Sequence, residues 1–241
     1  GLRRADLLVC DSRATLFDCK KHFPNVKSIC VPLGLDIDAF ANFAQTDSEV
    51  IGPAQNLPEG CNLLIVGSHD PRKRLKFICE VLGGLDDSIK SEIHIHHVGN
   101  AECPYGGPST HHLVKQNNVQ NWNGIGMNLS YRELMWMRIK SDALLFPSGS
   151  EGFGYPPLES MACGTKVLCS NLASHNELMP DDSCIEADDV VGWRKAIVEI
   201  HSQWKQSDGP IAAEQELIQH SRNFSMSTFN ERMAEAYLMM E

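Results

Sequence analysis

The sequence has no long apolar run. No stretch of its 241 residues approaches the roughly 18 consecutive apolar residues that a membrane-spanning helix needs, and the N-terminus, Gly1–Arg4, lacks the apolar region of a signal peptide. We therefore predict a protein without a transmembrane segment that resides in the cytoplasm. The apolar fraction of 42% is nevertheless large enough for a hydrophobic core.

Paired cysteines and excess positive charge are also missing. The nine cysteines contain no Cys-x-x-Cys pair, and their odd number argues against a disulfide framework, which favours a reducing compartment such as the cytosol. The net charge of −10 opposes general binding to nucleic acids or anionic membranes. An anionic ligand would have to be held by a local positive cluster.

Several nucleotide-binding motifs and a clear metal site are absent from the sequence. There is no Walker loop and no Gly-x-Gly-x-x-Gly after a strand, which disfavours P-loop proteins and nicotinamide dehydrogenases. His94 and His96 share a strand face and His111-His112 lie near a helix start, but a metal site needs three or four converging ligands. We expect His94 and His97 to be core or edge residues, and we predict no metal and no cofactor.

From Cys61 onward, short apolar segments alternate with amphipathic ones, which is typical of a doubly wound parallel sheet in a Rossmann-like α/β fold. Before it, strands at 6–10 and 28–31 flank a helix at 13–22, and the prolines and glycines of residues 35–60 predict an irregular linker. The predicted strands of the sheet are 63–66, 93–98, 119–122, 143–146, 166–169 and 183–186. The predicted helices are 72–82, one from 109, one from 130 with a Ser130/Glu133 capping box, one between Pro156 and Gly164, 188–205, 211–221 and 226–240.

Two carboxylates, Glu151 and Glu159, stand in a junction between two apolar strands. The proline pair Pro156-Pro157 suits the first helical turn, and Gly152–Gly154 would offer free backbone N–H groups at the positive end of the helix dipole. Anions bind at such places, at the carboxyl edge of a parallel sheet. We expect Glu159 in the first helical turn, where it could accept hydrogen bonds from the two hydroxyls of a ribose. Alternatively, Glu159 only complements the dipole and Glu151 is a surface loop residue.

A basic cluster, Gly67–Arg74, lies between another strand end and a helix start. Cations are disfavoured at a helix N-terminus, so their presence suggests that they neutralise an anion such as a diphosphate. The alternative is a solvated helix end.

With these residues in place, the chain resembles the donor-binding half of a retaining glycosyltransferase of the GT-B fold, in the large family 4 group. The resemblance covers nearly the whole chain. It rests on the Glu151-x7-Glu159 spacing, Pro71-Arg72-Lys73 after Gly67, the Asn123-Gly124 turn, Tyr131, Asp142, Met161–Gly164 and Glu177.

The resemblance implies a role for each matched residue. Lys73, Arg72 and Glu151 would be catalytic: the two cations would hold the diphosphate, and Glu151 would contact the transferred sugar. Glu159 would bind the ribose. The full donor-binding set would be Gly67, Ser68, Arg72, Lys73, Asn123, Ile125, Glu151, Gly152, Phe153, Gly154 and Glu159, with the base against a loop at 123–126. Many members have an arginine where this sequence has Ser68, and Arg72 or Arg74 could substitute for it.

The resemblance also implies a domain organisation. Residues 1–34 would be a remnant of an acceptor-side N-terminal domain, 35–60 a linker, 61–224 the donor domain, and 225–241 a helix that crosses back. The implied partners are a UDP- or GDP-linked sugar, an acceptor glycan, glycolipid or small molecule, and a missing N-terminal domain or partner chain. Two alternatives remain open: a non-catalytic nucleotide-sugar binding module that needs a partner domain, and a GT-B nucleotide-sugar epimerase.

Overall fold

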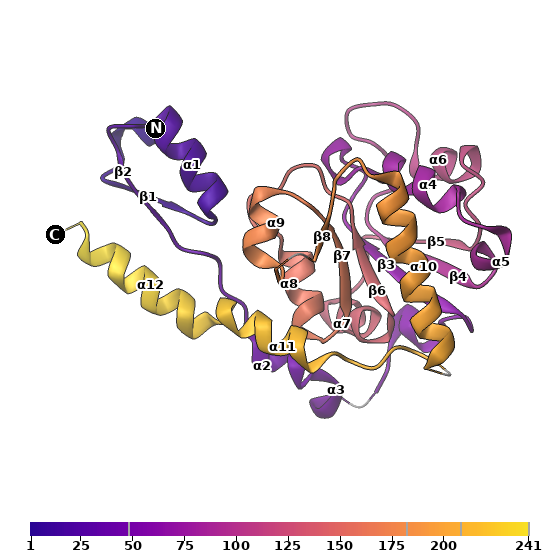
Figure 1. Cartoon of the computed structure of the whole chain (residues 1–241). Helices are drawn as coiled ribbons and strands as arrows, with labels where there is room; N and C mark the ends of the chain where they lie inside the picture. Colours follow the sequence, from indigo (N-terminus) through magenta and orange to yellow (C-terminus); the bar gives the residue numbers. More distant parts are fainter. Residues whose placement is uncertain (48, 182, 208, 241) are drawn as a thin grey trace.

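The computed structural model describes residues 1–47, 49–181, 183–207 and 209–240. Its main body is a six-stranded parallel sheet in the order β5-β4-β3-β6-β7-β8, with helices on both faces (Figure 1). The strands are β3 (Cys61–Val66), β4 (Ile93–Val98), β5 (Trp122–Gly126), β6 (Ala143–Phe146), β7 (Lys166–Ser170) and β8 (Cys184–Ile185). This architecture confirms the predicted doubly wound parallel sheet.

The helices follow the amphipathic segments of the sequence. Those of the main body are α4 (Leu75–Gly83), α5 (Asp87–Lys90), α6 (Thr110–Gln116), α7 (Tyr131–Lys140), α8 (Tyr155–Ala162), α9 (Ala173–Leu178), α10 (Val190–Gln206) and α11 (Gln215–Ser221). The predicted capping box is present, because Ser130 and Glu133 cap each other's backbone N–H groups at the start of α7. No helix in the described ranges is long and apolar enough to cross a membrane.

Alternating side chains of β3 build two apolar layers, one on each face of the sheet. Leu63 and Ile65 pack with α4 and α10, where Trp193 is fully buried. Leu64 packs on the other face, with α7 and α8. Burial of each of these leucine side chains stabilises the fold by about 2 kcal/mol. The sheet is therefore a rigid base for the loops at its edges.

The N-terminal residues form a separate small sheet. Strands β1 (Leu7–Cys10) and β2 (Lys27–Cys30) pair in parallel around α1 (Arg13–His22), preceded by the short turn η1 (Leu2–Arg4). The C-terminal helix α12 (Met226–Leu238) runs back towards this unit (Figure 1), and Lys27 Nζ donates a hydrogen bond to the Met239 carbonyl at 3.2 Å. Both predicted N-terminal strands and the helix between them are present.

Residues 35–60 are not the irregular chain that their prolines and glycines suggested. They form α2 (Ile37–Ala41), α3 (Phe43–Thr46) and the 3₁₀ turn η2 (Gly52–Asn56). Phe40 and Phe43 are buried, and both stack edge-on against Tyr131 at the start of α7. These contacts join the segment to the core, although its turns are too short for a visible helical period. The domain boundaries themselves remain predictions.

One strand lies further along the chain than predicted. The segment 119–122 was expected as a strand and 123–126 as a loop, but β5 begins at Trp122 and ends at Gly126. Asn121 has a left-handed backbone (φ 51°), which ends the turn just before the strand. Because β5 is an edge strand bonded only to β4, it tolerates the polar and glycine residues that looked like a loop.

Candidate functional site

The predicted site lies where the strand order of the sheet reverses. β3 and β6 are neighbours, whereas the chain continues from β3 to β4 on one side and from β6 to β7 on the other. Ligands of open α/β sheets bind at the carboxyl ends of strands around this switch point. The basic cluster follows β3 and the glycine loop follows β6, so both meet there.

The basic loop after β3 is held by local backbone contacts. Asp70 caps the 3₁₀ turn η3 (Pro71–Lys73) by accepting a hydrogen bond from the Arg72 N–H at 2.9 Å. The Arg72 carbonyl accepts from the Gly149 N–H at 2.7 Å and from Ser148 Oγ at 3.0 Å. These bonds tie the loop after β3 directly to the loop after β6.

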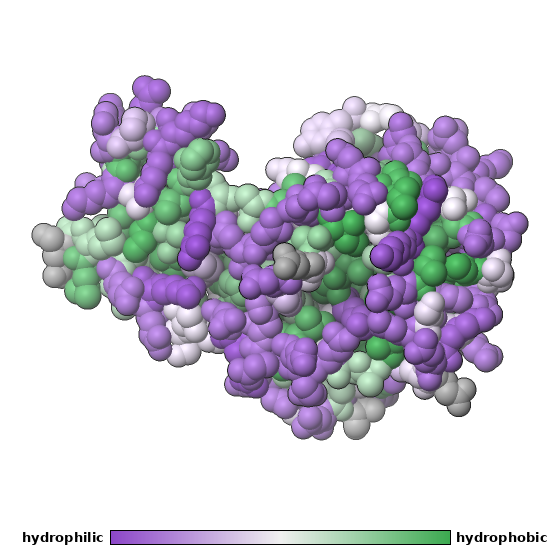
Figure 2. Space-filling view, in the orientation of Figure 1, coloured by the Kyte–Doolittle hydropathy of each residue, from purple (hydrophilic) through white to green (hydrophobic). Residues whose placement is uncertain are grey.

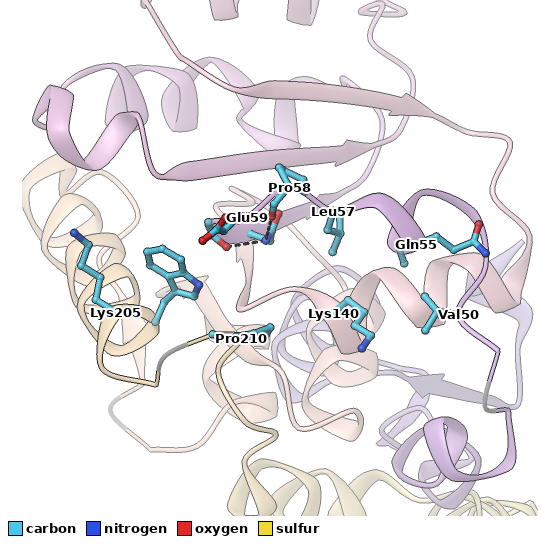
Figure 3. A pocket seen from close by; sticks show the side chains of 13 residues that line it. Val50, Gln55, Leu57, Pro58, Glu59, Lys140, Lys205 and Pro210 are labelled. Atoms are coloured by element: carbon cyan, nitrogen blue, oxygen red, sulfur yellow. Dashed lines mark hydrogen bonds between the residues drawn. The ribbon is translucent and has the colours of Figure 1, made fainter.

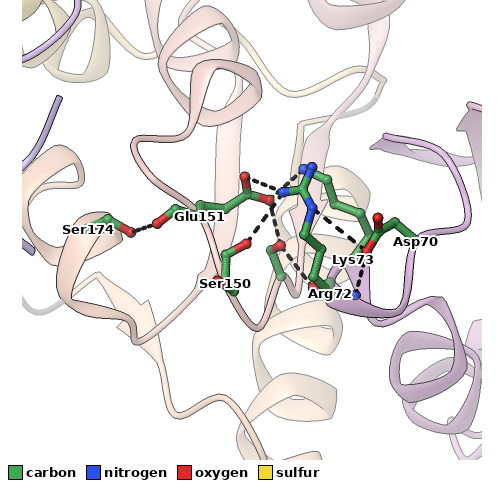
Figure 4. A network of polar contacts seen from close by, with 7 residues as sticks. Asp70, Arg72, Lys73, Ser150, Glu151 and Ser174 are labelled. Atoms are coloured by element: carbon green, nitrogen blue, oxygen red, sulfur yellow. Dashed lines mark hydrogen bonds and ion pairs between the residues drawn. The ribbon is translucent and has the colours of Figure 1, made fainter. Parts of the chain in front are cut away.

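Glu151 is the centre of an ion-pair network (Figure 4). Lys73 Nζ lies 2.5 Å from one of its carboxylate oxygens and Arg72 Nη1 lies 2.7 Å from the other. Ser148 Oγ, which is fully buried, donates to the same carboxylate at 2.6 Å. Burial raises the pKa of Glu151, but the hydrogen bonds from Lys73 and Ser148 and the charge of Arg72 outweigh it, so the pKa lies below its ordinary value. The carboxylate is therefore charged at neutral pH.

Three side chains of this network were missed at the level of sequence. Ser148 bridges the two loops, Ser174 Oγ donates to the Glu151 carbonyl at 2.9 Å, and the Phe146 ring lies 4.7 Å from Lys73 Nζ. A serine or phenylalanine near a strand end is too common to single out. The spacing Ser148-x-x-Glu151 was a usable signal for the first of them.

Arg72 and Arg74, the two predicted substitutes for the arginine that is absent at Ser68, have different partners in the structure. Arg72 lies in the network, but Arg74 points elsewhere: it pairs with Asp188, donates to the Ala187 carbonyl at 2.6 Å and stacks over Phe77. Arg72 and not Arg74 thus pairs with Glu151, which makes Arg72 the better candidate, and the substitution itself stays a prediction. Ser68 Oγ contacts Met127 Sδ at 3.4 Å, which links the end of β3 to the chain that follows β5.

The glycine loop before α8 presents unused donors. Within the described ranges, the backbone N–H groups of Gly152, Phe153 and Gly154 donate no hydrogen bond. Gly154 caps α8 with a left-handed backbone (φ 116°) that favours glycine, and the prolines stand in the first turn as predicted. The loop can therefore offer several N–H groups to an anion at the positive end of α8.

We had expected Glu159 in the first turn of α8, and this expectation is wrong. The helix begins at Tyr155, one residue before the prolines, so Glu159 falls in the second turn. Its side chain is 24% exposed and pairs with Arg138 of α7, whose side chain is only 3% exposed. Burial raises the pKa of Glu159, and Arg138 counteracts this effect in part.

The remaining predicted donor-binding residues are Gly67, beside the basic loop, and two residues of the edge strand β5. Gly67 follows β3 directly, has a left-handed backbone (φ 143°) and lies beside the Lys73 stem. Asn123 is an exposed residue of β5 and Ile125 a half-buried one. Their predicted contact with a base would therefore be made by an edge strand, not by a loop.

The histidines of β4 have partners inside the protein. His94 contacts the Glu59 carbonyl at 3.1 Å, His96 contacts Asn62 at 2.8 Å and His97 contacts the Gly67 carbonyl at 2.8 Å. These contacts fit the core and edge roles that we expected for His94 and His97. Among the residues that the structure describes, no group of three or more His, Cys, Asp or Glu residues could hold a metal ion.

A hollow of about 850 Å³ lies at the opposite edge of the sheet (Figure 3). Asn62, near the start of β3, lines it together with Lys140 and Trp204. Its position at the amino ends of the strands separates it from Lys73 and Glu151, which follow the carboxyl ends. We place the functional site at the carboxyl edge, where charged groups and free N–H groups converge.

Known proteins resemble this chain in sequence over part of its length. The family model described as glycosyl transferases group 1 matches residues 51–208, which is more than half of the chain. The O-antigen chain mannosyltransferase RfbU of Salmonella typhimurium is 37% identical over 73 residues, and O-antigen chain mannosyltransferase B of Escherichia coli is 33% identical over 69 residues. These matches cover 30% and 29% of this chain but only 21% and 18% of those proteins.

Solved structures resemble the chain over almost all of its length. The sucrose-phosphate synthase of Thermosynechococcus elongatus has a TM-score of 0.76 at 17% identity, over 99% of this chain and 59% of that one. The Anabaena protein HepE in complex with UDP and glucose has a TM-score of 0.75 at 14% identity, over 98% and 64%. The chain thus spans about three fifths of the structures that it matches, and this likeness shows a GT-B type fold. Together with the family model, it shows that the chain belongs to the glycosyl transferases group 1, the family 4 type that its paired-glutamate motif had indicated.

Proposed function

We propose that this chain is the donor-binding half of a retaining glycosyltransferase, which transfers a sugar from a nucleoside diphosphate to a hydroxyl acceptor. The observation that carries the proposal is the convergence of Lys73, Arg72 and the free N–H groups of 152–154 at the switch point of the sheet. Such groups match the charge of a diphosphate. Each charge-assisted hydrogen bond would contribute about 1.5–3 kcal/mol to holding it.

In the proposed complex, the diphosphate takes over Lys73 and Arg72 from Glu151. The released carboxylate would then accept hydrogen bonds from hydroxyls of the transferred sugar. Glu159, further along α8, would accept from the ribose, and the exposed edge of β5 would lie beside the base.

In the proposed reaction the nucleoside diphosphate leaves the anomeric carbon with the electron pair of the broken C–O bond while the acceptor hydroxyl enters from the same face and passes its proton to the leaving phosphate oxygen. Negative charge grows on the leaving diphosphate as the bond breaks. In the proposed complex Lys73, Arg72 and the backbone donors before α8 bind the diphosphate before the bond breaks, so they would stabilise that charge with little rearrangement. The positive charge that the leaving group needs thus comes from the protein, and we propose that no divalent metal is required.

The names of the similar proteins support a hexose donor. One is called a mannosyltransferase and another was solved with UDP and glucose. A third, from Burkholderia xenovorans, is a UDP-forming α,α-trehalose-phosphate synthase in complex with glucose-6-phosphate. We propose a UDP- or GDP-linked hexose as donor and a hydroxylated acceptor such as a glycan, a glycolipid or a small sugar.

We propose that a further domain packs on the N-terminal unit and completes the acceptor side. Val9 of β1 and Phe17 of α1 are exposed, and Tyr237 and Leu238 near the end of α12 are exposed as well. Figure 2 shows apolar side chains gathered along α12 and beside the N-terminal unit. A two-stranded sheet is marginal by itself, and the chain spans only part of its structural relatives.

The test is to incubate the chain with UDP- and GDP-linked hexoses and follow the release of the nucleoside diphosphate and the fate of the sugar. The proposal expects donor binding and slow hydrolysis, with little transfer to a defined acceptor. An epimerised nucleotide sugar would establish the epimerase instead. Binding without any turnover would favour a non-catalytic binding module.

A further inference from the structure

Arg138 is a buried cation within a mostly apolar stretch of α7. Met135, Trp136 and Met137, which precede it, are buried as well. Its Nη2 donates to Glu159 Oε2, and its Nη1 reaches the Leu134 carbonyl only at 3.5 Å. Its buried Nε has no hydrogen-bond partner in the described part of the chain. Glu159 is therefore the one carboxylate there that pairs with this cation.

A buried ion pair is a poor way to gain stability. Removing two charges from water costs several kcal/mol, and apolar side chains of similar volume often replace such a pair without loss. A leucine or methionine at position 138 would fill the space without this cost. The pair therefore calls for a reason other than packing.

The two oxygens of Glu159 have different surroundings. Oε2 faces Arg138, whereas Oε1 takes part in no hydrogen bond within the described ranges, and the side chain remains 24% exposed. Glu159 lies about one turn of α8 after Tyr155, which follows the glycine loop directly. One oxygen is thus held from the interior while the other stays available.

The charged and titratable groups around Glu159 come from four elements. Tyr131 and Arg138 belong to α7, and Tyr155 and Cys163 to α8 and its end; burial, together with the charge of Glu159, raises the pKa of both tyrosines. The segments of α2 and α11 also pack on α8 and carry Asp36, Asp38, Glu216 and His220, which form no hydrogen bond or ion pair with Glu159 in the described part of the chain. In the described part of the chain, Arg138 alone forms an ion pair with Glu159.

We propose that Arg138 is a positioning residue: it fixes Oε2 of Glu159, so that Oε1 can accept a hydrogen bond from the ribose of the donor. This inference rests on the proposed function. Because burial raises the pKa of Glu159 and Arg138 lowers it, loss of Arg138 raises that pKa further. A protonated carboxyl is a weaker acceptor than a carboxylate. As the pH is lowered, a variant without Arg138 should therefore lose binding of the ribose at a higher pH than the wild type does.

The experiment compares the wild-type chain with Arg138→Met and the charge-keeping Arg138→Lys. Calorimetry at several pH values measures the Kd of UDP and GDP, of their 2′,3′-dideoxy analogues and of inorganic pyrophosphate. In Arg138→Met, the affinity for the ribonucleotide should fall about tenfold or more, and it should weaken from a higher pH than in the wild type. The dideoxy analogue and pyrophosphate should be affected little, and Arg138→Lys should restore part of the ribonucleotide affinity.

The double variant Arg138→Met/Glu159→Gln covers the case in which the single variant does not fold, because it removes both charges. It should bind the ribonucleotide no better than the dideoxy analogue, with no pH dependence from this site. An equal loss for all three ligands in Arg138→Met, or an unchanged pH profile, would show a merely structural role. If the wild type binds no nucleoside diphosphate at all, the proposed function itself fails, which is a different result.

Discussion

Glu151 occupies both cations that the proposal assigns to the diphosphate, and this leads to an unusual prediction. The variant Glu151→Gln should bind a nucleoside diphosphate more tightly than the wild type does. In the wild type, the diphosphate has to displace the carboxylate from Lys73 and Arg72. In the variant, it displaces only a neutral amide.

The expected gain follows from the burial of the two pairs. Arg72 is 46% exposed, so its pair with Glu151 contributes less than about 1 kcal/mol. Lys73 and Glu151 are 14% and 11% exposed, and their charge-assisted bond is worth about 1.5–3 kcal/mol against about 1 kcal/mol for a neutral one. The difference of about 0.5–2 kcal/mol predicts about 2- to 30-fold tighter binding.

A nucleotide sugar should respond differently from a nucleoside diphosphate. The proposed contact between Glu151 and the sugar hydroxyls weakens in the variant. This loss should nearly cancel the gain at the diphosphate, so the affinity for the nucleotide sugar should change little. Calorimetry with UDP, GDP and their hexose conjugates measures both affinities. The matched control is Glu80→Gln, an exposed residue of α4. Equal or weaker binding of the nucleoside diphosphate by Glu151→Gln would refute the reasoning.

Three further predictions concern the carboxylates. Glu159→Ala should weaken binding of the nucleoside diphosphate by about 1–3 kcal/mol, because the ribose hydroxyls lose a charged partner; unchanged affinity in calorimetry would remove this assignment. Asp142→Ala should lower the free energy of unfolding by about 2–4 kcal/mol in urea denaturation, because the buried Asp142 carboxylate accepts hydrogen bonds from the Asn62 and Ile211 N–H groups at 2.7 and 2.8 Å. The affinity of this variant for nucleotides should not change. The pKa of Glu151 lies below its ordinary value, so the ion pairs of Glu151 stabilise the fold fully above the ordinary pKa, and this stabilisation is lost as the pH falls through the lowered pKa. The difference in the free energy of unfolding between wild type and Glu151→Gln should therefore shrink in acid. A difference that stays constant with pH would contradict the ion pairs.

Much of the fold followed from patterns that are local in the sequence. Apolar runs bounded by glycine or proline, such as Ala143–Phe146 before Pro147, are the strands β3, β4, β6 and β7. The same patterns failed at β5, since an edge strand needs apolar residues on fewer sides. They failed again at 35–60, where Phe40 and Phe43 are buried by a distant helix that no local period reveals.

The site was predicted in its parts but not in its contacts. The resemblance predicted Lys73, Arg72 and Glu151 as neighbours of one ligand, but it did not predict that they pair with one another. Arg138 is 21 residues from Glu159 in the sequence, and their pairing depends on how α7 packs on α8. Such pairings depend on tertiary packing, which spacing within the sequence does not show.

The most direct test of the donor site is calorimetry with UDP, GDP, dTDP and ADP on the wild type, on Lys73→Met and on Lys76→Met. Methionine keeps an unbranched apolar side chain at position 73 and removes the ammonium group that lies over Phe146, while Lys76 is an exposed lysine of α4. We predict that the wild type and Lys76→Met bind at least one of these nucleotides with equal affinity. Lys73→Met should bind it about 10- to 150-fold more weakly, the worth of one charge-assisted hydrogen bond. Equal binding by all three proteins, or binding of none of the four nucleotides by the wild type, would contradict the assignment of this site.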